Sequence, residues 1–276
     1  MIEGAHIGGV FATEVLSPDA FWRSVTERTE LGCHVLLVDI SARPHDLDPG
    51  RAVLRDLLCD AERARLAGFR IADAAWEYEA SHVALRLAVG RYLETPAGEV
   101  RFRNPADPFA PPEPIGAGFR RCRASLSHCR RFAAVALSPE QAVGIDVELF
   151  SRAGEALSVV RQFLSDVELM GVSAMPSESR PGASLLAWCL KEAALKSSGT
   201  GFQTDPRTVR IGFHAGRWTI GAPAVLAVGE VLYSSVTLRH PAAKDACVAL
   251  ALERGPVPVF MSCVTLQELV GIAAGS

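Results

Sequence analysis

Residues 142–150, AVGIDVELF, read as a buried β-strand that nevertheless carries two carboxylates, Asp146 and Glu148. Side chains alternate across a strand, so residues two positions apart project to the same side, where two like charges repel each other. A buried charge without a partner is costly, and a hard divalent cation with oxygen ligands would relieve both problems. The alternative is an exposed edge strand whose two acids are solvated. The strand therefore predicts either a metal site or a solvent-facing edge.

The composition narrows the classes of protein to which the chain can belong. Of its 276 residues, 49% are hydrophobic and 21% are charged, which favours a folded core and, by length, about two domains. The net charge of −3 gives no basic surface for nucleic acid. The sequence has no apolar run of the roughly eighteen residues that span a bilayer, and its N-terminus lacks the basic start of a signal peptide. Its seven cysteines include no C-x-x-C pair, which argues against a disulfide framework and a zinc site. We therefore expect a cytoplasmic protein that binds neither nucleic acid nor membrane.

Strand-like and helical patterns alternate along the chain and predict an α+β fold. Residues 33–41 and 132–137 read as strands, residues 49–70 as a helix, and residues 124–131 as a turn. We expect two pseudo-symmetric α/β halves of similar topology packed face to face, with their boundary at a turn near Ser138. The predicted parts are an N-terminal extension (1–32), an N-terminal half (33–138), a C-terminal half with the metal site (139–256) and a C-terminal tail (257–276).

A later helix, predicted over residues 184–202, brings a third carboxylate and two lysines together. Only three of the 28 basic residues are lysines, and Lys191 and Lys196 both lie in this segment. Glu192 and Lys196 are four residues apart and share a helix face, which on a solvated helix would be an ordinary Glu–Lys pair. The surrounding residues are strongly apolar, which favours a buried helix instead. Glu192 would then complete a three-carboxylate magnesium site with the two acids of the strand.

The segment SLSH, which ends in Ser127 and His128, precedes a predicted strand. The serine has no G-x-S-x-G elbow around it, which argues against a serine hydrolase. A turn that offers a hydroxyl, a backbone N–H and an imidazole suits an anion such as phosphate, and Arg130 and Arg131 follow directly. A lone histidine is also often structural, so both interpretations stay open at this point.

Two motifs together resemble the signature of the surfactin-type 4'-phosphopantetheinyl transferases. They are VGID (Val143–Asp146) and, after a gap of 41 residues, WCLKEAALK (Trp188–Lys196). The family signature reads [VI]-G-[IV]-D, a gap of similar length, and [FW]-[STC]-x-K-E-[SA]-x-x-K, a long pattern of high specificity. SLSH resembles the serine–histidine motif of the family, SSGTGF resembles its glycine-containing helix end, and DAERARLAGF and SHVALRLAVGRYL resemble its N-terminal helices. The resemblance covers residues 33–253.

This resemblance implies that the protein transfers 4'-phosphopantetheine from coenzyme A to a serine of an acyl or peptidyl carrier protein, in polyketide or nonribosomal peptide biosynthesis. It implies that Asp146, Glu148 and Glu192 hold Mg²⁺ and that Glu192 also accepts the proton of the serine. Lys196 and His128 would neutralise phosphate charge. The implied coenzyme A contacts are Ser127, His128, Lys191, Lys196, Arg63 and Arg65. Because the cleft would form between the two halves of one chain, we expect a monomer.

The sequence departs from the family pattern at two places on the nucleotide side of the donor site. The family usually has G-K-P in the loop before the serine–histidine motif, where this chain has FAPPEPIG with Pro111. It also commonly has an arginine before the second of its N-terminal helices, where this chain has AAWEYEASH, with Glu77 or one of its neighbours at that position. These changes predict weak coenzyme A binding unless an arginine compensates, and they leave an alternative function open. In that alternative, a repurposed homologue binds an already pantetheinylated carrier protein and catalyses a different step or only docks. The arginines that could compensate are Arg63, Arg65, Arg120, Arg121 and Arg123.

Overall fold

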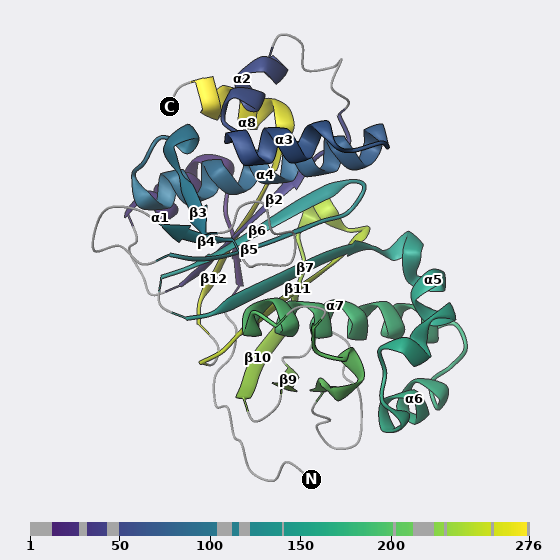
Figure 1. Cartoon of the computed structure of the whole chain (residues 1–276). Coiled ribbons are helices and arrows are strands. Elements are labelled where there is room, and N and C mark those ends of the chain that lie inside the picture. The colour runs from purple at the N-terminus through teal and green to yellow at the C-terminus, as the bar shows by residue number, and fades with distance from the viewer. Residues whose placement is uncertain are drawn as a thin grey trace. The chain divides into compact units, whose positions relative to one another are not determined.

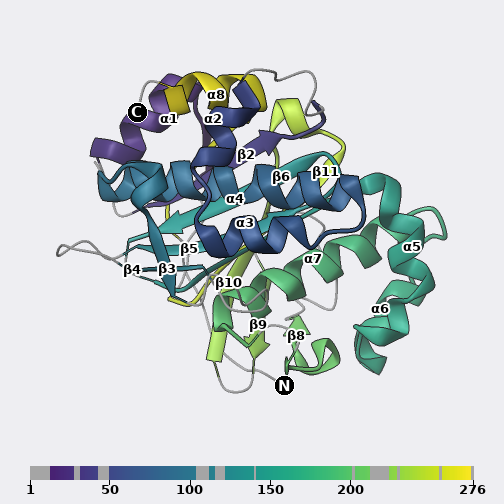
Figure 2. The same ribbon diagram turned by 45° about the horizontal axis from the view of Figure 1, so that its top comes forward.

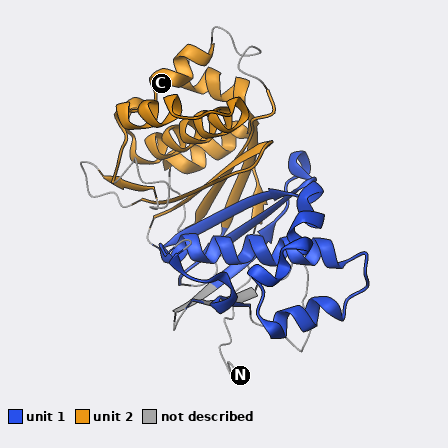
Figure 3. Ribbon diagram, turned by 45° about the vertical axis from the view of Figure 1, so that its right-hand side comes forward, with its two compact units in different colours: residues 1–12, 141–258 blue, residues 13–140, 259–276 orange. Residues whose placement is uncertain are grey.

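The computed structural model describes residues 13–27, 32–42, 50–103, 112–115, 122–139, 141–200, 203–211, 224–228, 231–254 and 257–274. The chain divides into two compact units (Figure 3). Unit 1 contains residues 141–258 together with the first twelve residues, which lie outside the described ranges, and unit 2 contains residues 13–140 and 259–276. Unit 2 is thus discontinuous in sequence, because the chain leaves it to form unit 1 and then returns.

Unit 2 is built on a five-stranded mixed sheet with the strand order β1-β12-β2-β6-β5 (Figure 1). β12 pairs in parallel with β1 and β2, whereas β6 pairs antiparallel with β2 and β5. β2 and β6 are almost entirely apolar and buried, as expected for strands covered on both faces. The strands span Thr13–Val15 (β1), Cys33–Asp39 (β2), Arg123–His128 (β5), Phe132–Ser138 (β6) and Val259–Thr265 (β12), and a separate pair consists of β3 (Arg101–Arg103) and β4 (Glu113–Ile115).

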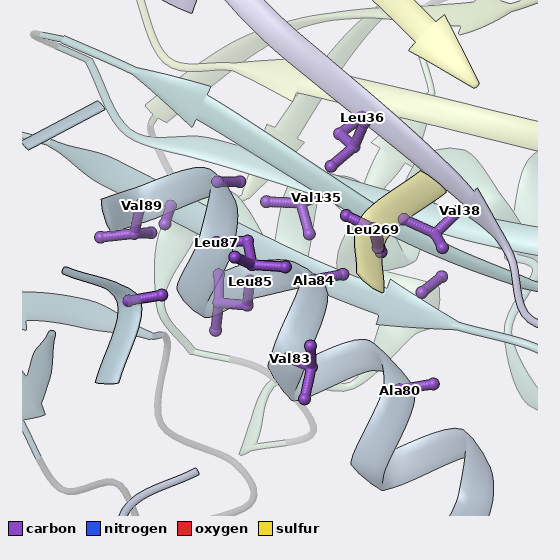
Figure 4. Packing of buried hydrophobic residues seen from close by; sticks show 14 of the residues in the cluster. Leu36, Val38, Ala80, Val83, Ala84, Leu85, Leu87, Val89, Val135 and Leu269 are labelled. Carbon is purple, nitrogen blue, oxygen red and sulfur yellow. The ribbon is translucent and has the colours of Figure 1, made fainter. Parts of the chain in front are cut away.

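The core of unit 2 lies between this sheet and its helices. Figure 4 shows Leu85 and Leu87 of the long helix α4 in one apolar cluster with Leu36 of β2, Val135 of β6 and Leu269 of α8. α2 begins against α8, and Figure 2 shows the two helices side by side. The helices span Pro18–Glu27 (α1), Gly50–Asp56 (α2), Asp60–Ala67 (α3), Ala72–Leu93 (α4) and Leu266–Ala274 (α8).

Unit 1 has a five-stranded antiparallel sheet with the order β7-β11-β10-β9-β8, and one long helix, α7, packs against it. The register of β7 on β11 places Asp146 opposite Ala249 and Glu148 opposite Cys247. The elements span Val143–Leu149 (β7), Ala153–Ser158 (α5), Asp166–Ser173 (α6), Arg180–Ser198 (α7), Arg210–Ile211 (β8), Ala224–Val228 (β9), Val231–Leu238 (β10) and Ala246–Leu252 (β11).

The bounds of α7 follow from its sequence. Pro181 lies in the first turn, where the missing N–H costs nothing, and Gly199 ends the helix at a positive φ of 72° that glycine tolerates. Between them, the residues from Ala183 to Leu195 are almost all buried. The helix therefore has no solvated face broad enough for an ordinary surface Glu–Lys pair.

The mixture of helices and sheets agrees with the α+β class predicted from the sequence, and several details differ. The helix expected over 49–70 is two helices, because the Glu62 carboxylate accepts the N–H of Cys59 (2.8 Å) and starts α3 there. The segment expected to be a turn before β6 is strand β5. Residues 13–27 and 259–274, expected to be an extension and a tail, form elements of unit 2. Pseudo-symmetry of the two halves stays a prediction.

Two further findings concern disulfide bonds and membrane-spanning helices. All seven cysteines are free thiols. Among the described residues, none of the helices is both long and apolar enough to cross a membrane.

Candidate functional site

The strand β7 and the helix α7 approach each other unusually closely in unit 1, and Gly144 makes this possible. A Cβ atom at position 144 would overlap the carbonyl oxygen of Ala193 and the N–H of Ser197 on α7. Asp146 and Glu148 follow Gly144 at intervals of two and so project from the same side of β7, toward α7. The glycine of the VGID motif therefore brings two carboxylates against the helix face that carries Glu192 and Lys196.

Two cationic side chains hold the acids of the strand. The Lys196 Nζ donates to Asp146 Oδ1 at 2.7 Å, with the lysine side chain 28% exposed and the aspartate side chain 8% exposed. Arg152, in the short 3-10 helix Phe150–Arg152, donates its Nη1 to both carboxylate oxygens of Glu148 at 3.1 Å. β7 is an edge strand of its sheet, but both of its acids are paired with cations, so the alternative of two solvated acids does not describe this site.

Glu192 completes an acidic cluster with Asp146 and Glu148. It is 7% exposed, and its Oε1 accepts no hydrogen bond from the part of the chain that the structure describes. Burial, followed by the charge of Asp146, raises the pKa of Glu192 to about 7, against the opposing effect of Lys196. Burial and Asp146 likewise raise the pKa of Glu148, against Arg152. The three acids therefore lie close enough to repel one another and are only partly compensated by the two cations.

An additional positive charge would stabilise the acidic cluster, although its carboxylates are not arranged to coordinate a metal ion. Within the described ranges, no three His, Cys, Asp or Glu side chains are grouped closely enough to coordinate an ion as they stand. The ion pairs with Lys196 and Arg152 occupy oxygens that a metal would need. The buried Oε1 of Glu192 is the feature that fits a cation, because burial of an acceptor without a donor is otherwise unfavourable.

Lys191 does not belong to this cluster, and its predicted contact with coenzyme A is wrong. Its ammonium is fully buried and donates to Glu168 Oε2 (2.7 Å), to the Phe163 carbonyl (2.9 Å) and to the Pro206 carbonyl (3.1 Å). The second oxygen of Glu168 accepts the N–H of Ile211 at 3.0 Å. Lys191 is thus a structural residue that joins α7 to α6 and to the segment that precedes β8.

Ser127 and His128 lie in unit 2 at the end of β5. Because they are successive residues of a strand, their side chains project to opposite faces of the sheet, so they do not share one anion-binding turn as expected. His128 lies on the side of Ala124 and Leu126, which pack against the core that contains α4. Its Nδ1 is 3.4 Å from the Glu77 Oε2 of α4.

The arginines considered for phosphate binding have different surroundings. The Arg63 guanidinium is paired with Asp60 at 2.6 Å and also donates to the carbonyl of Leu58. The Arg65 guanidinium lies over the ring of Tyr78, 5.3 Å from its centre. Arg123 lies 3.8 Å from Glu113 of β4. The remaining candidates, Arg120 and Arg121, and the position of the missing lysine, Pro111, lie outside the described residues.

The structure adds three residues that the sequence did not single out as parts of the site. Arg152 pairs with Glu148. The only indication of this pair in the sequence is that Arg152 follows Glu148 by four residues. Gly144 was noted only as part of a motif. The need for a glycine at this position becomes clear only from the structure, in which α7 leaves no room for a Cβ atom. Glu77 was noted as a departure from a family pattern, whereas its contact with His128 joins residues 51 positions apart.

Comparison with known proteins gives independent information on the segment that carries the acidic cluster. Residues 142–251 match the family model of the 4'-phosphopantetheinyl transferase superfamily. The chain is similar to the 4'-phosphopantetheinyl transferase HetI of Nostoc sp., with 29% identity over 161 residues that cover 56% of this chain and 66% of that protein. It is also similar to a putative 4'-phosphopantetheinyl transferase of Synechocystis sp., slr0495, with 23% identity over 145 residues that cover 52% of this chain and 58% of that protein.

The chain thus matches less than two thirds of the length of either relative. The matched segment contains β7, α7 and β11, and with them Asp146, Glu148, Glu192 and Lys196. The comparisons thus show that residues 142–251 of this protein resemble the 4'-phosphopantetheinyl transferase superfamily.

Proposed function

We propose that this protein is an enzyme that transfers the 4'-phosphopantetheine group of coenzyme A to a serine of an acyl or peptidyl carrier protein. The observation that carries the proposal is the acidic cluster with Lys196, which lies within the segment that matches the transferase family. Transfer of a phosphoryl-linked group needs a proton acceptor, charge neutralisation and positioning. The cluster offers side chains for the first two of these tasks.

We infer that Mg²⁺ is the cation that this cluster takes, held by Asp146, Glu148 and Glu192. Three carboxylates face two cations, and the buried Glu192 Oε1 accepts no hydrogen bond from the described residues, so an added dication would be favoured. Lys196 would exchange Asp146 for phosphate when donor and metal bind, which is feasible because its side chain is 28% exposed. When bound, Mg²⁺ would neutralise pyrophosphate charge and improve the leaving group.

The roles of the residues of unit 1 follow from their protonation and charge. Without a bound cation, burial and the charge of Asp146 raise the pKa of Glu192 to about 7. A bound Mg²⁺ would lower this pKa, and Glu192 would then be a carboxylate that can take the proton of the serine. The serine oxygen then bonds to the phosphorus that carries pantetheine, while the bond from that phosphorus to the bridging oxygen breaks and 3',5'-ADP leaves. Lys196 would donate to a phosphate oxygen whose charge increases as that bond breaks.

His128 and Arg65 of unit 2 are proposed to contact phosphates of coenzyme A, whereas Ser127 is buried and projects to the opposite face of the sheet from His128. His128 is 37% exposed at its side chain and so is accessible to a ligand. Lys191 is withdrawn from this set because of its burial, and Arg63 is already engaged with Asp60. The carrier proteins we propose as partners are those of polyketide or nonribosomal peptide assembly.

The test is mass spectrometry of an apo carrier protein that has been incubated with this protein, coenzyme A and Mg²⁺. We expect a mass increase equal to the phosphopantetheine group, which is lost with Asp146→Ala and with EDTA. Binding of a carrier without any mass increase, with coenzyme A or with dephospho-coenzyme A as donor, would instead favour the repurposed homologue. Undiminished transfer by the Asp146→Ala protein would disprove the role of the acidic cluster.

A further inference from the structure

Glu77 and His128 come together from two elements of unit 2, α4 and β5, that pack against each other in its core. Glu77 lies in the second turn of α4, and His128 is the last residue of β5. The Glu77 Oε2 and the His128 Nδ1 are 3.4 Å apart, with the side chains 19% and 37% exposed. The carboxylate is thus mostly covered, while the imidazole keeps a surface that a ligand can reach.

The backbone on both sides of this contact is well anchored. The neighbour of Glu77, Trp76, donates its indole N–H to the carbonyl of Ile40 at 3.0 Å. Glu79, two positions further on, is buried and paired with Arg51 at 2.8 Å. His128 pairs with Ala133 across the β5–β6 ladder. The carboxylate therefore meets the ring from a fixed direction, unlike an exposed ion pair between two flexible side chains.

An imidazole has two nitrogens, and the partner of one determines the proton and the direction of the other. With Nδ1 turned to the Glu77 carboxylate, Nε2 is the nitrogen on the opposite side of the ring. When both nitrogens carry protons, Nδ1–H faces the Glu77 carboxylate at the 3.4 Å ion-pair distance, and Nε2–H is left to donate to an anion. A carboxylate that holds one nitrogen thus prepares the other for a phosphate oxygen.

We propose that Glu77 is a positioning residue that holds the His128 ring so that Nε2 faces a phosphate of the nucleotide donor. This inference rests on the proposed function, because it needs His128 to contact coenzyme A. It assigns a role to an acidic residue of the segment in which the family pattern has an arginine. In this chain, Glu77 acts through the histidine and does not itself touch the phosphate.

The kinetic test compares Glu77→Ala, Glu77→Gln and the control Asp73→Ala. Asp73 lies one turn earlier on the same face of α4 and is exposed, so its replacement removes the same charge without the His128 contact. We expect Glu77→Ala to raise the KM for coenzyme A about tenfold and to leave kcat within about twofold, as the loss of one oriented polar contact does. Glu77→Gln, whose amide oxygen can still accept from Nδ1–H, should rescue most of this loss. An unchanged or lower KM in Glu77→Ala, or the same rise in Asp73→Ala, would disprove the proposal.

A spectroscopic test does not depend on turnover, so its failure is distinct from failure of the proposed function. In protein labelled with ¹⁵N-histidine, the resonances of His128 among the seven histidines are identified by their loss in His128→Gln. For the neutral ring, we expect the proton on Nδ1 in the wild-type protein and loss of this preference in Glu77→Ala. With both ring nitrogens protonated, addition of coenzyme A should shift the Nε2 resonance of the wild-type protein more than that of Glu77→Ala. The same tautomer and the same shift in both proteins would show that Glu77 does not position the ring.

Discussion

At the scale of single residues, Glu192 shows most directly that the candidate site is arranged for function at the expense of stability. A buried carboxylate beside two others costs free energy in the absence of a cation, since desolvation and repulsion both oppose its charge. A fold selected for stability alone would place an apolar residue or an amide at this position. The protein is therefore expected to be more stable when this charge is removed.

We predict that Glu192→Gln raises the free energy of unfolding by about 1–2 kcal/mol in Mg²⁺-free buffer, because it removes one of three like charges. Millimolar Mg²⁺ should raise the melting temperature of the wild-type protein and have a smaller effect on the variant. Glu178→Gln, the same chemical change at an exposed glutamate of unit 1, is the control. Urea unfolding measures the free energy of unfolding, and thermal unfolding measures the melting temperature. A less stable Glu192→Gln protein would mean that Glu192 has a structural role.

His34 should make unit 2 sensitive to acid. It is 3% exposed on β2, with its ring 6.0 Å from that of Phe21 and 5.4 Å from that of Phe260. Burial lowers its pKa from 6.5 to about 4. The unfolded chain therefore binds a proton near pH 6.5 that the folded chain binds only near pH 4. The contribution of this histidine is fully present above pH 6.5 and is lost as the pH falls toward 4.

We predict that the wild-type protein loses up to about 3 kcal/mol of unfolding free energy over this range from His34, at about 1.4 kcal/mol per pKa unit. The His34→Leu protein should show a smaller loss, and the remaining slope is expected from His82, whose pKa is also lowered to about 4 by burial. Urea unfolding at a series of pH values measures the difference. Parallel pH profiles for the two proteins would contradict this assignment.

At the scale of elements, the contact between β7 and α7 controls the site. Both elements must approach to backbone distance before the acids of one face Glu192 and Lys196 of the other. We predict that Gly144→Ala destabilises unit 1 by about 2 kcal/mol or more, because the added Cβ has only backbone atoms to displace. Transfer activity should fall with it.

The matched control for this change is Gly182→Ala in the first turn of α7, where a Cβ would meet nothing within 4 Å. That protein should be as stable as the wild type or more stable, since alanine favours a helix over glycine. Chemical unfolding of the two variants side by side gives the comparison. Equal stabilities would show that α7 moves away from β7 without cost.

The elements also show what the sequence could and could not predict. The strand of Asp146 and Glu148 and the helix of Glu192 were predictable because each has a clear local pattern and definite end signals. The strand that carries His128 was predicted as a turn, because its alternation of small and polar residues is weak without β6 beside it. Lys191 was misassigned because its partner, Glu168, lies on another helix and has no local signal.

At the scale of the whole molecule, every residue proposed for the reaction comes from a single chain. We therefore predict a monomer whose specific activity does not depend on protein concentration. Light scattering coupled to size-exclusion chromatography measures the mass, and dilution of the transfer assay tests the activity. A stable dimer that loses activity when it dissociates would contradict this prediction.

The position of β12 has a consequence for the order in which the protein is made and folds. β12 is a late segment of the chain, yet it lies between β1 and β2, so the sheet of unit 2 lacks an interior strand until residue 265 has been synthesised. Unit 1 needs only residues 141–258 for its own sheet and can close first. The usual order, in which N-terminal domains fold first on the ribosome, is then reversed. Chains that end at residue 258 and have been released from the ribosome should resist protease over unit 1, while residues 13–140 are still cleaved.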